Sequence, residues 1–221
     1  MSHCGGFKGI ASVVIMSAVI LISICADSYA MGLGSTAYCS YGSGEIDKTS
    51  KEYFSDNKVE KKGTAKYGLC GIGLVLESNP FNERFSFRMT PGVGFGRISK
   101  KYTRKEYNDE TKTIISTDKV TQKYNVFDVN LTAKFSFKVL MRDNFNIWVG
   151  PMARIGKCRD NSKDYNDYMF GGGVTAGTNI RMTEMVYLTA SPSACILYSG
   201  NSKVDLLYTD CRVDIGVMTI L

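Results

Sequence analysis

Histidine is almost missing from this sequence. Its one histidine is His3, which lies in a segment that we expect to be removed on export. Imidazole is the commonest general acid and base in enzymes, and it is the base of the serine and cysteine triads. Because the rest of the chain offers no such group, we predict a protein that is not an enzyme.

The groups that hold metals and cofactors are also poorly supplied. The cysteines beyond residue 30, at positions 39, 70, 158, 195 and 211, lack the C-x-x-C spacing of zinc and cluster sites. The glycine-rich run at 92–96 lacks the strand-then-helix context of a phosphate-binding loop. Asp128 and Asp214 could act as a carboxylate pair, but basic residues share their strand faces, which favours salt bridges. We expect no metal and no cofactor.

Concentrated charge is another absence. The formal net charge is +6, yet the basic residues are spread along the chain without the compact stripe and interleaved aromatic residues of a nucleic-acid reader. We therefore exclude nucleic acid as a partner. Mild basicity suits contact with anionic lipid headgroups or glycans, and it equally suits an ordinary solvated surface.

The one long apolar run lies at the amino terminus. Lys8 precedes an almost unbroken apolar stretch at 10–24, and Ser28 and Ala30 place small residues at the −3 and −1 positions of a cleavage site. This pattern is typical of a secretory signal peptide. A membrane anchor would need about 20 apolar residues, and a lipoprotein signal ending at Cys25 is disfavoured by Ile24. We predict a cleavable signal peptide at 1–30 and one mature domain at 31–221.

Helical periodicity is lacking after residue 30, and strict alternation takes its place. Residues 84–97 show it most clearly, because one face there is apolar and the other carries only arginine, serine, threonine or glycine. Residues 127–139 and 211–221 repeat the pattern. The apolar face at 84–97 consists of Phe85, Phe87, Met89, Pro91, Val93 and Phe95. Two chemically different faces indicate β-strands.

The alternating blocks predict about eight strands. They fall at 32–46, 65–78, 84–98, 123–140, 145–157, 168–182, 185–198 and 205–221. Short turns at 79–83, 141–144 and 183–184 alternate with longer polar loops at 47–64, 99–122, 158–167 and 199–204. Short turns at one end and long loops at the other are typical of transmembrane barrels. We predict an all-β, up-and-down antiparallel transmembrane barrel.

Proline is scarce, and three of the four prolines occupy equivalent positions in an ungapped weak repeat. Pro91, Pro151 and Pro192 all sit in the apolar phase at the same height above a turn. Because proline cannot donate to a strand ladder, these positions predict a recurring local bulge. Chance alignment of alternating strands is the alternative.

The polar face decides which side of the barrel meets lipid. A soluble barrel would expose that face to water, yet here it carries isolated charges and glycines, which suit the narrow inside of a small barrel. The apolar face has no mid-strand charge, as lipid contact requires. Trp148 falls in the inward phase and is an exception. The glycines are Gly71, Gly73, Gly92, Gly94, Gly96, Gly171, Gly173 and Gly177, and the charges are Glu77, Arg84, Arg88, Asp128, Lys134, Arg154, Arg181, Arg212 and Asp214.

In overall plan, residues 31–221 resemble the eight-stranded outer-membrane barrels of the OmpA transmembrane-domain and OmpX type, and outer-membrane surface antigens of host-associated bacteria. The resemblance rests on strand layout and on a last strand that ends at the apolar Leu221. It implies a bacterial outer-membrane location and contact with outer-membrane lipid and lipopolysaccharide-type headgroups. We expect a surface antigen or adhesin with a host surface ligand. A small porin-like pore and a soluble periplasmic lipocalin-like binder are the alternatives.

The loop predicted at 99–122 is the candidate interaction site, because binding residues concentrate on loops held by a rigid scaffold. It could bind an anionic glycan or a host protein, and a plain solvated loop is the alternative. The candidate residues are Lys100, Lys101, Tyr102, Arg104, Lys105 and Tyr107.

Cysteine pairing is the second open question, since five mature cysteines leave at least one unpaired. Cys39, Cys70 and Cys211 fall in the apolar phase of strands that barrel closure makes neighbours. We hypothesise that some of them form a cross-strand disulfide or link molecules, so that the protein is a monomer or a disulfide-linked oligomer. The alternative is that each is a small hydrophobic residue.

Overall fold

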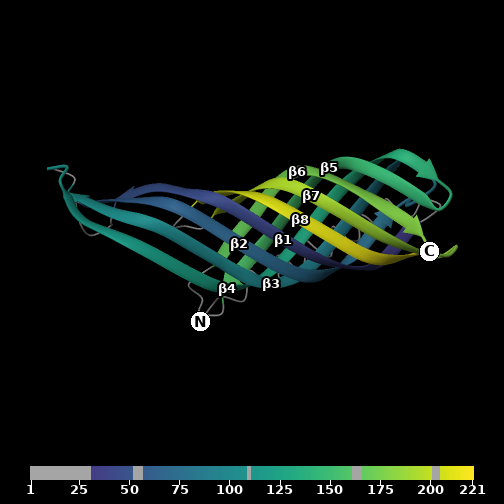
Figure 1. Cartoon of the computed structure of the whole chain (residues 1–221), viewed down its shortest axis with the longest axis horizontal. Helices are drawn as coiled ribbons and strands as arrows, with labels where there is room; N and C mark the ends of the chain where they lie inside the picture. The colour runs from purple at the N-terminus through teal and green to yellow at the C-terminus, as the bar shows by residue number, and fades with distance from the viewer. Residues whose placement is uncertain (1–30, 52–56, 109–110, 161–165, 201–204) are drawn as a thin grey trace, which may run out of the picture.

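The computed structural model of the chain describes residues 31–51, 57–108, 111–160, 166–200 and 205–221. These residues form eight antiparallel strands that pair in sequence order, and β8 pairs with β1 to close the barrel (Figure 1). The predicted up-and-down barrel is confirmed, whereas the predicted signal peptide lies outside the described residues. The strands are β1 (Met31–Lys51), β2 (Asn57–Ser78), β3 (Phe85–Asn108), β4 (Ile114–Arg142), β5 (Phe145–Asp160), β6 (Asn166–Arg181), β7 (Val186–Gly200) and β8 (Asp205–Ile220).

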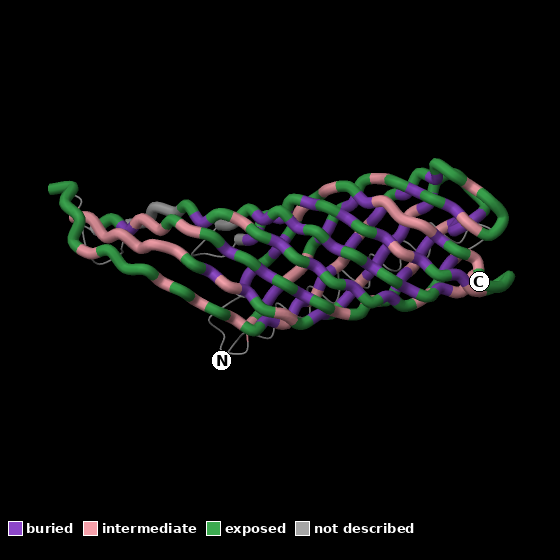
Figure 2. The backbone as a smooth tube through the Cα atoms, viewed as in Figure 1, coloured by how far each residue is buried: buried purple, intermediate pink, exposed green. Residues whose placement is uncertain are grey.

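The apolar face of the barrel points outward. Phe85, Phe95 and Ile72 are 68%, 69% and 66% exposed, whereas inward-phase residues such as Ser86 and Gly94 are buried. Figure 2 shows this alternation of buried and exposed residues along the strands. A closed barrel with an apolar outer belt satisfies its backbone internally and presents lipid with hydrocarbon. The lipocalin-like alternative required the opposite orientation and is wrong.

Aromatic pairs mark both edges of this belt. At the turn end, Phe85 packs against Phe137 with ring centroids 5.2 Å apart. At the other end, the rings of Phe95 and Phe127 lie 5.0 Å apart, as do those of Phe170 and Tyr198. These girdles define where the lipid-facing wall begins and ends.

Most of the residues predicted as two long loops are strand instead. β1 continues to Lys51 and β2 begins at Asn57, while β3 continues to Asn108 and β4 begins at Ile114. Because β8 pairs with β1 only as far as Glu45, and β5 with β4 only from Val126, these four strands extend past the other four as a protruding sheet (Figure 1). We define the protruding sheet as residues 46–51, 57–66, 97–108 and 114–125.

The three prolines interrupt strand ladders but do not create the predicted bulges. At Pro91 the β2–β3 pairing stops at Gly73–Gly92 and resumes at Leu76–Met89 in the same register. Pro151 and Pro192 produce equivalent gaps in the β4–β5 and β6–β7 ladders. A missing N–H removes a ladder bond without adding a residue, so the register survives. The β3–β4 and β4–β5 ladders do shift register, but elsewhere, at Glu106/Tyr107 and Lys138/Leu140.

The turn between β2 and β3 folds across the barrel end. Phe81 is 9% exposed and meets the ring of Tyr187 edge-on at 5.3 Å. Lys138 donates hydrogen bonds to the carbonyl oxygens of Asn79 and Glu83. This turn therefore covers the turn end of the interior, and an apolar cluster that includes Tyr67, Leu69 and Ile98 fills the opposite end.

Candidate functional site

An ion pair and its hydrogen-bond partners fill the interior next to the covering turn. Arg88 donates to Glu77 at 2.6 Å, to Thr189 at 2.8 Å and to Asn179 at 3.0 Å. Trp148, whose inward phase the sequence singled out, is fully buried here, and the Arg88 guanidinium lies 4.9 Å from its ring centroid. The inward phase of Trp148 in the sequence therefore correctly predicted that its side chain points into the barrel.

A second group of ion pairs lies at mid-barrel. Asp214 accepts hydrogen bonds from Lys134 at 2.8 Å and from Arg212 at 2.7 Å. Further up, Arg154 lies 3.2 Å from Asp128 and 3.3 Å from Asp210. Asp128 and Asp214 thus belong to separate ion pairs, which argues against a catalytic carboxylate pair.

Not every charge that the alternation assigned to the interior lies there. Arg84 is exposed in the turn before β3. Arg181 is half-buried at the turn end of the interior, where its guanidinium lies 4.3 Å from the ring centroid of Phe81. Asp167 and Asp210 are buried interior acids that the sequence reasoning missed. Their inward phase on β6 and β8 was the available signal.

The interior glycines make room for large aromatic side chains. A Cβ at Gly71 or Gly94 would lie 2.6 Å from the Tyr38 side chain, and a Cβ at Gly177 would lie 2.3 Å from Trp148. Glycine is required at these positions because a ring from another strand lies over the backbone. The barrel interior is therefore packed with side chains, as expected for eight strands.

The described residues lack the features of a metal site and of a membrane-spanning helix. Among the described residues, no group of three or more histidine, cysteine, aspartate or glutamate side chains could hold a metal ion. Within those same ranges, no helix has the length and apolarity needed to span a membrane.

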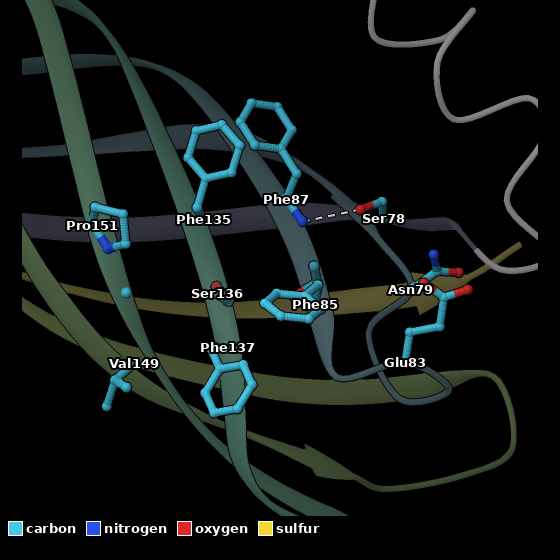
Figure 3. Close-up of a pocket in the computed structure, with 12 residues that line it drawn as sticks. Ser78, Asn79, Glu83, Phe85, Phe87, Phe135, Ser136, Phe137, Val149 and Pro151 are labelled. Atoms are coloured by element: carbon cyan, nitrogen blue, oxygen red, sulfur yellow. Dashed lines mark hydrogen bonds between the residues drawn. The ribbon is translucent and has the colours of Figure 1, made fainter.

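A depression lies on the outer wall at the turn end (Figure 3). Its volume is about 310 Å³, and aromatic residues of the lipid belt, including Phe85, Phe87 and Phe135, form much of its lining. The amide of Phe87 donates to the Ser78 hydroxyl at 2.9 Å beside it. Glu83 is the one ionisable residue of the lining. The depression is a hollow in a lipid-facing wall and has no acid–base pair.

The candidate residues predicted in the 99–122 loop lie on strand β3, where alternation divides them between two faces. Lys100, Tyr102 and Arg104 share the inner face, and the Lys100 ammonium lies 3.9 Å from Asp167. On the outer face lie Lys101, Lys105 and Tyr107. The structure therefore does not bring the six together into one site.

The outer-face residues belong to a larger basic surface that the sequence reasoning missed. Strands β2 and β4 place further lysines beside Lys101 and Lys105 on the same side of the protruding sheet. The signal was a basic residue at every fourth position, which on a strand keeps one face. We call this surface the cationic face; it comprises Lys58, Lys62, Lys66, Arg97, Lys101, Lys105, Lys119 and Lys123.

Glu60 is the single acid on the β2–β4 part of this face, among the described residues. It lies 2.8 Å from the Lys62 ammonium and accepts a hydrogen bond from the Tyr107 hydroxyl at 3.0 Å. These two contacts lower the pKa of Glu60 below its ordinary value. Glu45 and Asp47 on β1 border the face along one side.

The structure joins Cys39 to Cys70, which are direct partners of β1 and β2 with Cα atoms 4.2 Å apart. Cys211 is a free, exposed thiol on β8. Cys158 and Cys195 are buried thiols in the interior. The sequence hypothesis named the bonded pair and left the pairing open, because register was needed to choose it.

Comparison with solved structures gives similar barrels. The outer membrane protein OprG of Pseudomonas aeruginosa has a TM-score of 0.49 at 8% identity, over 88% of this chain and 97% of that chain. Neisserial surface protein A has a TM-score of 0.43 at 13% identity, over 86% and 97%. The attachment invasion locus protein Ail of Yersinia pestis has a TM-score of 0.34 at 12% identity, over 86% and 99%. No family model and no curated protein matches the sequence.

The geometry of the chain itself defines its class. Eight antiparallel strands close into a ring, an apolar belt with aromatic edges surrounds it, and charged groups are paired inside. Closed barrels of this kind are the β-structures that span outer membranes. The protein is a small outer-membrane β-barrel.

Proposed function

We propose that the protein is a non-enzymatic surface protein whose barrel is an anchor and whose protruding sheet contacts ligands outside the cell. The observation that carries this proposal is the extension of β1–β4 beyond the lipid belt as a paired sheet with a cationic face. A paired sheet holds its side chains in fixed positions, which suits recognition better than an unstructured loop. The proposed role of this surface protein is that of an adhesin or surface antigen.

The packed interior disfavours the pore alternative. Arg88, Arg154 and Arg212 are almost fully buried across the lumen, and the turn that contains Phe81 covers one end. An open aqueous path would require these ion pairs to separate, which is costly in a desolvated interior.

Cysteine labelling on intact cells tests which end of the barrel is outside. Lys112 lies in the β3–β4 connection at the tip of the protruding sheet, and Asp143 lies in the short β4–β5 turn. In a Cys211→Ser background, a membrane-impermeant maleimide should label Lys112→Cys on intact cells. It should label Asp143→Cys only after the outer membrane is permeabilised. Equal labelling of both on intact cells, or the reverse order, would contradict the orientation.

Shortening the β3–β4 hairpin tests the ligand-binding role. Removing residues 103–119 joins Tyr102 near its register partner Val120 and leaves every barrel pair intact. Cells that display the shortened protein should attach to cultured host cells no better than cells without the protein, while the full-length protein increases attachment. Full attachment with the shortened hairpin would overturn the proposed role.

A further inference from the structure

The basic residues of the cationic face form a staggered lattice. On β2 they occupy positions 58, 62 and 66, on β3 positions 97, 101 and 105, and on β4 positions 119 and 123. In register, Lys66 and Lys123 flank Ser99, whereas Lys101 lies between two threonines. The bases of β3 therefore fall between those of its neighbours, and successive bases on one strand are about 13 Å apart.

Hydroxyl groups fill most of the alternate positions of the lattice. The register pairs place Thr64 beside Lys101 and Ser99 beside Lys66, and these four residues line a depression of about 240 Å³. Two ammonium groups and two hydroxyls around one hollow supply the donors that a tetrahedral oxyanion accepts. The remaining outward threonine hydroxyls on these strands are those of Thr103, Thr117 and Thr121, among the described residues.

The length of the lattice identifies the kind of ligand. From Arg97 to Lys105 it covers about 26 Å along β3, or roughly 20 Å of height at a strand tilt near 40°. A headgroup layer is only about 5–8 Å deep on each side of a bilayer, so lipid headgroups would reach only the lowest bases. Nucleic acid would require stacking platforms, and Tyr107 is the single aromatic residue among these outward positions.

We propose that the cationic face binds a linear polyanionic polysaccharide, bearing sulfate or carboxylate groups, that runs along the protruding sheet. This proposal rests on the proposed function, since it names the ligand class of the same surface. Charge complementarity supports it: eight bases face one acid on β2–β4, and Glu45 and Asp47 lie only along the β1 border. The repeat along each strand matches a polymer with recurring anionic groups.

Two triple variants separate this ligand from a lipid headgroup. The lower set, Lys66→Gln, Arg97→Gln and Lys123→Gln, lies next to the lipid belt, and the upper set, Lys58→Gln, Lys105→Gln and Lys119→Gln, lies beyond it. A control removes three exposed bases outside the face: Lys112→Gln, Arg142→Gln and Arg159→Gln. All three variants lose the same charge. The probe is fluorescent dextran sulfate, with uncharged dextran for comparison, and each protein is held in phosphatidylcholine nanodiscs.

Each face variant should bind dextran sulfate about tenfold more weakly than the native protein, with a shallower dependence on salt. The control variant should bind like the native protein. Loss only in the lower set, together with enrichment of phosphatidylglycerol around the native barrel, would assign the face to lipid headgroups and overturn the proposal. Equal binding by all variants would also overturn it. The maleimide result is independent of both outcomes, so failure of the proposed orientation would be seen separately.

Glu60 provides a variant with the opposite effect. Glu60→Gln removes the one acid of the β2–β4 face and should strengthen dextran sulfate binding at neutral pH. Because its contacts lower the pKa of Glu60 from 4.5, the native protein should show constant binding above that pH and stronger binding only below it. Weaker binding by Glu60→Gln would contradict a face that acts through its positive charge.

Discussion

Arg154 holds together the ion pairs with Asp128 and Asp210 in the barrel interior. It is 1% exposed and lies between the carboxylates of Asp128 and Asp210. Arg154→Met would leave both acids buried without their cation, which should lower the free energy of unfolding by roughly 3–5 kcal/mol. Urea unfolding in detergent, followed by Trp148 fluorescence, measures this change.

A matched exposed arginine controls for charge loss. Arg159→Met on the outer face of β5 should change stability by less than about 0.5 kcal/mol. Neutralising the orphaned acids, as in Arg154→Met with Asp128→Asn and Asp210→Asn, should recover part of the loss. A stability unchanged by Arg154→Met alone would show that the ion pairs contribute nothing.

Gly177 permits a test of the packed interior. It lies directly opposite Trp148 on β5, and an added Cβ would lie 2.3 Å from the indole ring. Gly177→Ala should therefore cost roughly 1–3 kcal/mol through overpacking and change the near-ultraviolet circular dichroism of Trp148. Gly68→Ala is the control, because no heavy atom outside the adjacent residues lies within 4 Å of its added Cβ. Equal effects of the two substitutions would refute the packing argument.

At the scale of elements, sequence patterning predicted strands where one face meets lipid and the other meets the interior. Residues 85–96 of β3 show this contrast, since phenylalanines alternate with buried polar residues and glycine. Residues 99–108 of the same strand do not, because both faces of the protruding sheet carry polar groups. Lys100 and Lys101 therefore read as a loop, and only the pairing with β2 and β4 shows that they point to opposite sides.

The sequence could not predict which interior side chains pair across the barrel, because that also depends on strand pairing. Alternation assigned Arg88, Arg154 and Asp128 to the interior, but their partners come from strands whose register the sequence does not specify. The Arg88–Asn179 contact, for example, joins β3 to β6. The proline positions were recognised, yet whether a missing N–H would shift the register depends on the opposing strand.

The link between β1 and β2 gives a prediction at this scale. Cys39 and Cys70 are bonded across a sequence separation of 31 residues. Replacing both with serine should lower the free energy of unfolding by about 3–4 kcal/mol in the chain-entropy account of disulfides. Cys211→Ser, which removes the free exposed thiol, should leave unfolding unchanged. A native protein insensitive to reductant in the same assay would contradict the bond's contribution.

At the scale of the whole molecule, the filled interior predicts that the barrel does not conduct ions. Purified protein inserted in a planar bilayer should show no stable stepwise conductance, because side chains and paired charges occupy the lumen of an eight-stranded barrel. A porin in the same bilayer is the positive control. Reproducible steps from the native barrel would revive the pore alternative.

The strand register of the protruding sheet, which shifts once at Glu106/Tyr107, also limits how this surface can change in length during evolution. Adding or removing two residues within β2, β3 or β4 keeps each later side chain on its original side, whereas a change of one residue reverses every side chain beyond it. Natural variants of the hairpin should therefore tolerate even length changes and avoid odd ones, unless a bulge such as that at Glu106/Tyr107 absorbs the extra residue. Insertions and deletions in this hairpin should therefore occur two residues at a time.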